Sequence, residues 1–228
     1  MRRATTSILL ALLLLPAAPA RQGAAADTPR SAGLRLPWRE AGWSEREAAA
    51  HLLDRLAFGA RPGEVDRVVA VGLEAWVEGQ LGAALPERGL ERRLAALPAL
   101  GMTAAKIAET YPPGFVVREL AVEAGDVSRA EIERAQASGQ DSDQRELRRR
   151  IATWMRSQGL RSERELLAQS YAQKLLRAAY AENQLAEVLA DFWFNHFNVS
   201  ITDNPVRGYL LAYQRDALRP HLFGRFRD

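Results

Sequence analysis

Apolar residues recur at helical spacing along most of the chain, and no stretch alternates apolar and polar residues strongly enough to predict a strand. Ser44 opens the segment SEREAAAHLLDRLAFG, where Ser44 and Glu47 match a helix capping box. Two short helices are expected to meet near Gly72, and a third is predicted over residues 87–97, between prolines. The predicted fold class is therefore all-α or mostly α, in an irregular multi-helix domain.

Residues 125–146 are polar and are predicted to form a surface loop or a frayed helical connection. The segment that follows, QRELRRRIATWMRSQG, has helical propensity and is strongly basic on one side. Acidic residues of the preceding polar stretch are expected to balance these arginines.

Two long helices give the best periodic signal, each with an apolar stripe that is expected to face the core. The stripe of the first contains Leu167, Tyr171, Leu175 and Ala179. The stripe of the second contains Leu185, Leu189, Phe192, Trp193 and His196.

The N-terminus has the layout of a secretory signal peptide. Arg2 and Arg3 precede an apolar run over residues 8–15, and small residues after it offer cleavage sites. The run is shorter than the ~20 residues that a membrane-spanning helix needs, although an uncleaved signal anchor is the alternative. We expect a signal peptide at 1–20 (cleavage as late as 26), a linker at 21–40 and a helical domain at 41–228. The protein is then exported, to the periplasm, cell envelope or medium, and has no transmembrane span after cleavage.

Charge and cysteine content narrow the function. Cleavage would remove Arg2 and Arg3, so the formal net charge of +3 falls by two. Little excess positive charge remains, which argues against a nucleic-acid partner. The chain has no cysteine, which excludes disulfides, thiolate metal sites and cysteine nucleophiles.

The segment LADFWFNHFNVS concentrates aromatic residues around one histidine and admits two interpretations. In the first, His196 is a core histidine with hydrogen-bonded nitrogens, and a neighbouring asparagine helps to end the helix. In the second, His196 is a metal ligand or general base, oriented by Asn195 or Asp191. His51 and His221 are the other histidines, and linear spacing does not show whether either approaches His196.

Other catalytic signatures are missing from the sequence, including a glycine-rich phosphate loop, a nucleophile elbow and a His-Glu-x-x-His zinc helix. Arg55 and Arg177 could hold an anionic substrate, because a guanidinium suits carboxylate or phosphate, and Trp193 could add an aromatic contact. The alternative role of both arginines is ion pairing with surface acids. Glu182 and Glu187 are predicted to lie on a helix surface.

Four segments together resemble a bacterial family known as domain of unknown function 1800. They are HLLDRLAFGARPGEV, GLEAWVEGQL, KLLRAAYAENQLAEVLADFWFNHFNVS and YLLAYQRDALRPHLFGRFRD. The resemblance implies an exported, helix-rich protein, and this chain would be the N-terminal part of a longer family domain. Many members carry a second histidine where Phe194 stands, which weakens a paired-histidine metal site here. Genes of the family look commonly paired with exported proteins that resemble sulfatases and alkaline phosphatases.

We therefore expect an exported binding or accessory protein that acts beside a sulfatase- or phosphatase-like partner. The alternative is a metal-assisted hydrolase whose site lies around Asn195 and His196. Its candidate catalytic residues are His196 and Asn195, and its ligand-binding candidates are Arg55, Arg177 and Trp193. A divalent metal would be held by His196, His51 and His221. A fragment without a function of its own is the third reading.

Overall fold

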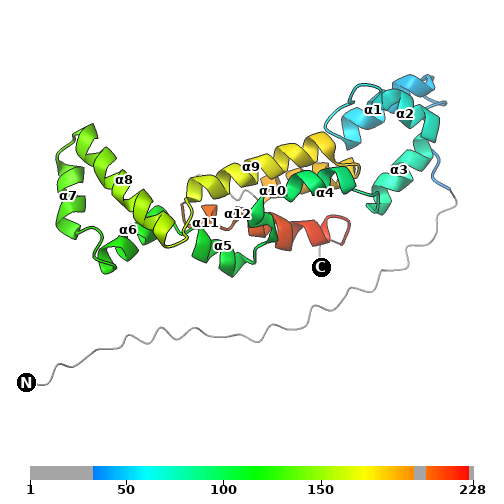
Figure 1. Ribbon diagram of the computed structural model, residues 1–228. Helices are drawn as coiled ribbons and strands as arrows, with labels where there is room; N and C mark the ends of the chain where they lie inside the picture. The colour runs from blue at the N-terminus through cyan, green and yellow to red at the C-terminus, as the bar shows by residue number, and fades with distance from the viewer. Residues whose placement is uncertain (1–32, 198–203, 226–228) are drawn as a thin grey trace, which may run out of the picture. The chain divides into compact units, whose positions relative to one another are not determined.

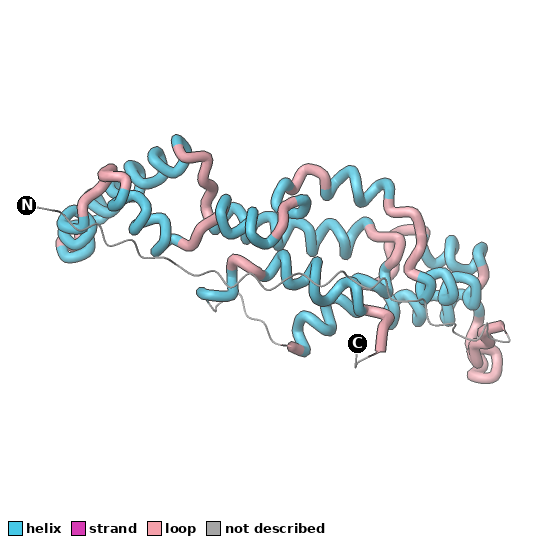
Figure 2. Tube along the Cα trace, turned by 90° about the horizontal axis from the view of Figure 1, so that it is seen from below, coloured by secondary structure: helices cyan, strands magenta, loops and turns pink. Residues whose placement is uncertain are grey.

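The computed structural model describes residues 33–197 and 204–225, in which the regular elements are all helices (Figures 1 and 2). The mostly α fold class is therefore confirmed. The predicted signal peptide and most of the predicted linker lie outside the described residues. The described residues from Arg35 onward belong to one compact unit. None of the described helices is both long and apolar enough to cross a membrane.

The first helices begin and end at the signals that the sequence carries. Helix α1 (Glu45–Leu56) begins with the predicted capping box, in which Ser44 and Glu47 bond reciprocally. Helices α2 (Glu64–Val71) and α3 (Leu73–Gly82) meet at Gly72, as predicted. Gly72 has a φ of 93°, a value that L side chains rarely adopt, so glycine permits this junction.

A small core lies where the middle of the chain meets its last part. Helix α4 (Arg88–Leu94) covers part of the helix predicted over 87–97, and is followed by the 3₁₀ turn η1 (Pro98–Gly101) and by α5 (Ala104–Thr110). The buried core cluster consists of Ala99, Ile107, Tyr111, Leu166, Leu211 and Ala212.

The polar region 125–146 is helical for most of its length, so the loop interpretation was wrong. Helix α6 (Gly114–Glu123) is followed by α7 (Arg129–Ala137) and α8 (Asp141–Ser157), with only a short connection between these two. A second capping box, formed by Ser128 and Glu131, begins α7. This local signal outweighs the low apolar content of the segment.

Helices α9 (Glu163–Tyr180) and α10 (Gln184–His196) pack against each other and are joined by a short turn. The predicted inward stripe of α9 was wrong, because Tyr171 is 55% exposed and Leu175 is 70% exposed. The buried face of α9 carries Leu166, Gln169 and Gln173 instead. Two amides thus face the interior, where hydrophobic periodicity predicts aliphatic side chains.

Four short elements form the last described part of the chain. They are α11 (Asn204–Arg207), α12 (Leu210–Ala212), the π-helical segment η2 (Tyr213–Leu218) and the 3₁₀ turn η3 (Arg219–His221). Segment η2 contacts α10, and Leu210, Leu211 and Leu218 are buried. Residues 198–203, which include the end of the FWFNHFNVS motif, lie outside the described residues.

Candidate functional site

The turn between α9 and α10 is held by hydrogen bonds to residues 80–87, about 100 positions earlier in the chain. The amide of Gln80, which is buried on α3, donates to the carbonyl of Glu182 (2.8 Å) and accepts from the backbone N–H of Leu185 (3.0 Å). Asn183 donates its side-chain amide to the carbonyl of Leu85 (2.9 Å) and to Glu87 (2.7 Å). These bonds satisfy backbone groups that a buried turn would otherwise leave unpaired.

A buried carboxylate on α2 adds a charged contact to the same turn. Glu64 accepts hydrogen bonds from Arg61 (2.5 Å) and Arg67 (2.7 Å), and Arg67 also reaches Glu182 (3.0 Å). Burial by itself would raise the pKa of Glu64. The hydrogen bonds and charge of Arg61, with help from Arg67, outweigh burial and lower this pKa to about 2.

One turn along α10, Glu187 is buried between two arginines. Its carboxylate accepts from Arg219 on η3 (2.5 and 2.9 Å) and from Arg177 on α9 (3.3 Å). Arg177 also donates to Gln173, and Gln173 donates to Gln214. The pKa of Arg177 is lowered, first by burial and next by the charge of Arg219. The prediction that Glu187 lies on a helix surface was wrong, because its side chain is 7% exposed.

Arg177 is therefore occupied by groups of the protein itself. Its partners Gln173 and Glu187 come from α9 and α10. Its ion pair is with a buried acid, although the sequence had suggested surface acids as the partners. Anion binding by Arg177 stays a prediction, and a ligand would have to compete with these contacts.

The next turn of α10 forms a further ion pair with α9. Lys174 pairs with Asp191, and the side-chain amide of Asn195 donates to the backbone carbonyl of Asp191 (2.8 Å). Asn195 and Asp191 were the groups expected to orient His196. The bonds that the structure shows for them go to other atoms.

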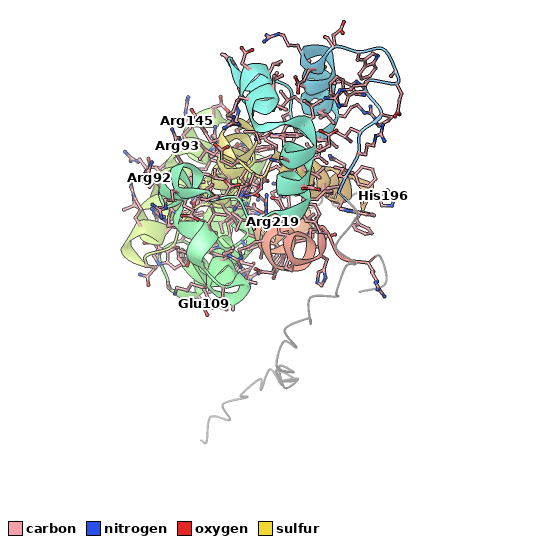
Figure 3. The ribbon with its side chains drawn as sticks, turned by 90° about the vertical axis from the view of Figure 1, so that its right-hand side faces the viewer. Arg92, Arg93, Glu109, Arg145, His196 and Arg219 are labelled. Atoms are coloured by element: carbon pink, nitrogen blue, oxygen red, sulfur yellow. The ribbon has the colours of Figure 1, made fainter. Side chains whose placement is uncertain are left out.

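Four ring-bearing side chains lie together on the outer side of the last turn of α10. We call these residues, Phe192, Trp193, His196 and Phe197, the aromatic end of α10. His196 stacks on Phe192, with centroids 5.7 Å apart, and meets Trp193 and Phe197 at 5.5 Å each. Phe192 is 54% exposed and Phe197 is 48% exposed. His196 is exposed as well and lies at the margin of the ribbon in Figure 3. The interpretation of His196 as a core histidine is therefore wrong.

A pocket of about 370 Å³ lies beside the aromatic end. Trp193 and Phe197 form one side, and the remaining lining residues come from the last described segment. These residues are Ala217, Leu218, His221, Leu222, Gly224 and Arg225. The structure thus brings two candidates, Trp193 and His221, to one apolar pocket with a guanidinium at its edge.

The two candidates on α1 lie elsewhere. His51 meets Trp43 edge-on, with centroids 4.8 Å apart, and lines a separate apolar pocket with Leu36 and Trp38. Arg55 is exposed in the last turn of α1, and its side chain makes no hydrogen bond or ion pair within the described residues. Within residues 33–197 and 204–225, no three His, Asp or Glu side chains are grouped closely enough to hold a metal ion. A metal site at His196, His51 and His221 stays a prediction.

Sequence reasoning missed the polar residues that position α10. They are the buried residues Gln80, Gln173, Glu187 and Gln214, and the partly buried Arg219. A faint signal was present, because Gln169, Gln173 and Arg177 recur every four residues along α9. Their partners lie up to 105 positions away in the chain, so local patterns could not identify them.

Comparison with known families agrees with the sequence resemblance. The model of the family described as Protein of unknown function (DUF1800) matches residues 51–228, well over half of the chain. No curated protein and no solved structure matches the chain. The family match spans the candidates on α1, α9, α10 and η3.

Proposed function

The chain belongs to this family of proteins of unknown function, and from that premise we propose that it is an exported binding protein. Its binding surface is the aromatic end of α10, and its partner is another protein. The observation that carries the proposal is the exposure of Phe192 and Phe197 at the end of a helix whose other faces are held by buried polar contacts.

Exposed aromatic side chains on a rigid frame are typical of protein interfaces. Aromatic residues are enriched at the centres of interfaces, where they bury a large apolar area at low cost in side-chain entropy. The aromatic end joins an apolar pocket, which could receive a side chain of the partner. His221 and Arg225 on that pocket favour a partner with acidic residues around its apolar contact.

The proposed partner class is an exported sulfatase- or alkaline-phosphatase-like protein. The gene pairing implied by the family resemblance suggests this class, and the signal-peptide pattern of residues 1–26 suggests the compartment. The binding surface argued above does not depend on this choice of partner.

Biolayer interferometry with a purified partner of this class measures the binding affinity and tests the proposal. Two substitutions, Phe192→Ser and Phe197→Ser, should together weaken binding at least tenfold, since one interface anchor contributes about 2 kcal/mol or more. Phe115→Ser on α6 is the matched control, because Phe115 is also exposed but lies outside the aromatic end. Equal affinities for wild type and the double variant would contradict the proposal.

A metal-assisted hydrolase is the second candidate function, and one observation favours it. An imidazole (His221), an indole (Trp193) and a guanidinium (Arg225) line one pocket, while exposed His196 lies against the same indole. In that function His196 and Asn195 would be catalytic, and Arg55 would serve an anionic substrate. Elemental mass spectrometry of wild type, His196→Ala and His221→Ala tests it. Stoichiometric metal that either substitution removes would favour this function, and its absence from wild type would count against a metal-assisted reaction.

A further inference from the structure

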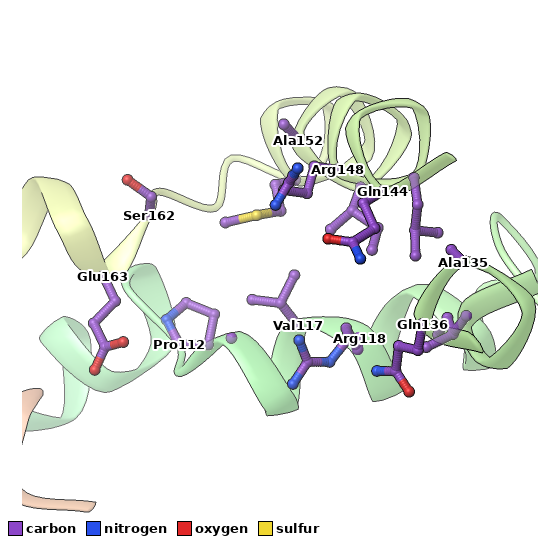
Figure 4. Close-up of a pocket in the computed structure, with 15 residues that line it drawn as sticks. Pro112, Val117, Arg118, Ala135, Gln136, Gln144, Arg148, Ala152, Ser162 and Glu163 are labelled. Atoms are coloured by element: carbon purple, nitrogen blue, oxygen red, sulfur yellow. The ribbon is translucent and has the colours of Figure 1, made fainter. Parts of the chain in front are cut away.

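A second pocket lies between α6, α7 and α8, and none of the candidates discussed above lines it. It has a volume of about 470 Å³ (Figure 4). Helix α8 contacts both α6 and α7, yet none of its residues is fully buried. The pocket therefore keeps an apolar wall that its own helices only partly cover, formed by Val117, Ile132, Leu147, Ile151 and Met155.

Two arginines lie on opposite sides of this pocket, Arg118 on α6 and Arg148 on α8 (Figure 4). Neither arginine side chain makes a hydrogen bond or ion pair within the described part of the chain. The acids nearest to them in sequence are already paired, Glu119 with Arg129 and Glu146 with Arg149. Glu163 also lines the pocket, and it pairs with Arg207 at 3.9 Å. The two free guanidinium groups therefore favour an anionic group between them.

The dimensions of the pocket favour a slender ligand. Lining residues of α8 run from Gln144 to Met155, which corresponds to about 16 Å at a rise of 1.5 Å per residue. The pocket offers about 470 Å³, which lies in the ~300–1,000 Å³ range of small-molecule sites. Arg148 lies seven residues before Met155, so a head group beside Arg148 leaves about 10 Å of α8 for the chain, which is the length of an extended chain of about eight or nine carbons at about 1.2 Å per bond.

We propose that this pocket binds a single-chain amphiphile with a carboxylate head, that is, a medium-chain fatty acid. The alkyl chain lies along the apolar wall and covers the half-exposed side of α8. The carboxylate lies between Arg118 and Arg148, whose guanidinium groups donate paired hydrogen bonds to it. This site is independent of the aromatic end of α10.

Isothermal titration calorimetry with sodium dodecanoate, below its micelle concentration, tests the proposal. We expect one molecule bound per chain, and the double variant Arg118→Gln/Arg148→Gln should weaken binding at least tenfold, because two charge-assisted hydrogen-bonding groups are lost. The matched control is Arg88→Gln/Arg92→Gln, which removes two exposed arginines of α4 that do not line the pocket. This control should bind dodecanoate like wild type.

Two further ligands separate the contribution of the carboxylate head from that of the alkyl chain. Butanoate, which has the head but a short chain, should bind at least tenfold more weakly than dodecanoate. Dodecyltrimethylammonium should bind more weakly than dodecanoate, and loss of the two arginines should not weaken it further. Ile151→Phe narrows the pocket without changing its charge and should also weaken dodecanoate binding, with thermal unfolding as the check that each variant is folded.

Several results would overturn the proposal. One is a lack of dodecanoate binding by wild type. Another is a dodecanoate affinity of the Arg118→Gln/Arg148→Gln variant equal to that of wild type. An acidic amphipathic helical peptide that binds the pocket when dodecanoate does not would assign it to a protein partner instead.

Discussion

At the scale of single residues, Glu187 links α10 to both α9 and η3. Its carboxylate pairs with Arg177 and with Arg219, and its side chain is 7% exposed. We expect Glu187→Gln to lower the free energy of unfolding by about 3 kcal/mol, because two partly buried guanidinium groups would lose their shared buried counterion. Urea unfolding followed by far-UV circular dichroism measures this change.

Glu182 provides the matched control for that substitution. It lies in the same hairpin and pairs with Arg67, but its side chain is 41% exposed. Glu182→Gln should cost less than about 1 kcal/mol, as solvent screens exposed pairs. If the two variants lost similar stability, Glu187 would not hold the buried position that we describe.

The clamped carboxylate of Glu64 predicts a pH dependence of stability. Its pKa is about 2 in the folded protein, against a usual 4.5, so the unfolded chain binds this proton first as the pH falls. The stabilisation is complete above pH 4.5 and is lost between about pH 4.5 and pH 2. We expect it to amount to about 2 kcal/mol, a value discounted because Arg67 is half exposed.

Unfolding free energies of wild type and Glu64→Gln across pH 2–6 measure this contribution. The gap between the two proteins should be at its full value from about pH 5 upward and should close toward pH 2. Glu133→Gln, which changes an exposed glutamate, should follow wild type throughout. A gap that stays constant with pH would contradict the charge interaction.

His196 is exposed, and this too has a measurable consequence. His196→Ala should change the free energy of unfolding by no more than about 0.5 kcal/mol, as is usual for surface positions. A loss of about 1–3 kcal/mol would restore the core interpretation, since an unfilled, unpaired site costs that much. Chemical unfolding of the two proteins side by side decides between these results.

At the scale of elements, helix starts were the most predictable feature because their signals are local. Ser44 and Glu47 lie three positions apart, and the structure forms the predicted box. Ser44→Ala should lower the free energy of unfolding by about 1 kcal/mol, because a backbone donor at the helix start loses its acceptor. Thr153→Ala within α8 is the control and should be neutral or slightly stabilising, because alanine has the higher helix propensity. Equal effects in thermal unfolding would argue against the cap.

Helix faces were less predictable than helix starts. The apolar stripe of α9 points outward at Tyr171 and Leu175, while Gln169 and Gln173 point inward. Apolar periodicity assumes that burial follows hydrophobicity, and here hydrogen bonds allow amides to be buried instead. Gln169, for example, accepts from the backbone N–H of Ala99 and donates to Tyr111. Such pairings depend on tertiary contacts that a local pattern does not contain.

At the scale of the whole molecule, the helical class and the family could be predicted from the sequence. The candidate site could be predicted in part, because the FWFNHF motif drew attention to the end of α10. Its exposure could not be predicted, since it depends on which face of α10 is held by Gln80, Arg177 and Arg219, three residues outside α10. The aromatic end is outward because the opposite side of the helix carries these polar contacts.

The central claim is that the aromatic end of α10 is an outer binding surface and not part of the core. The equilibrium unfolding free energy of Phe192→Ser/Phe197→Ser, compared with wild type, tests this claim most directly. The two rings are about half exposed, so we predict a loss below about 1.5 kcal/mol. A loss of about 3 kcal/mol or more per phenylalanine is typical of core positions and would contradict the account.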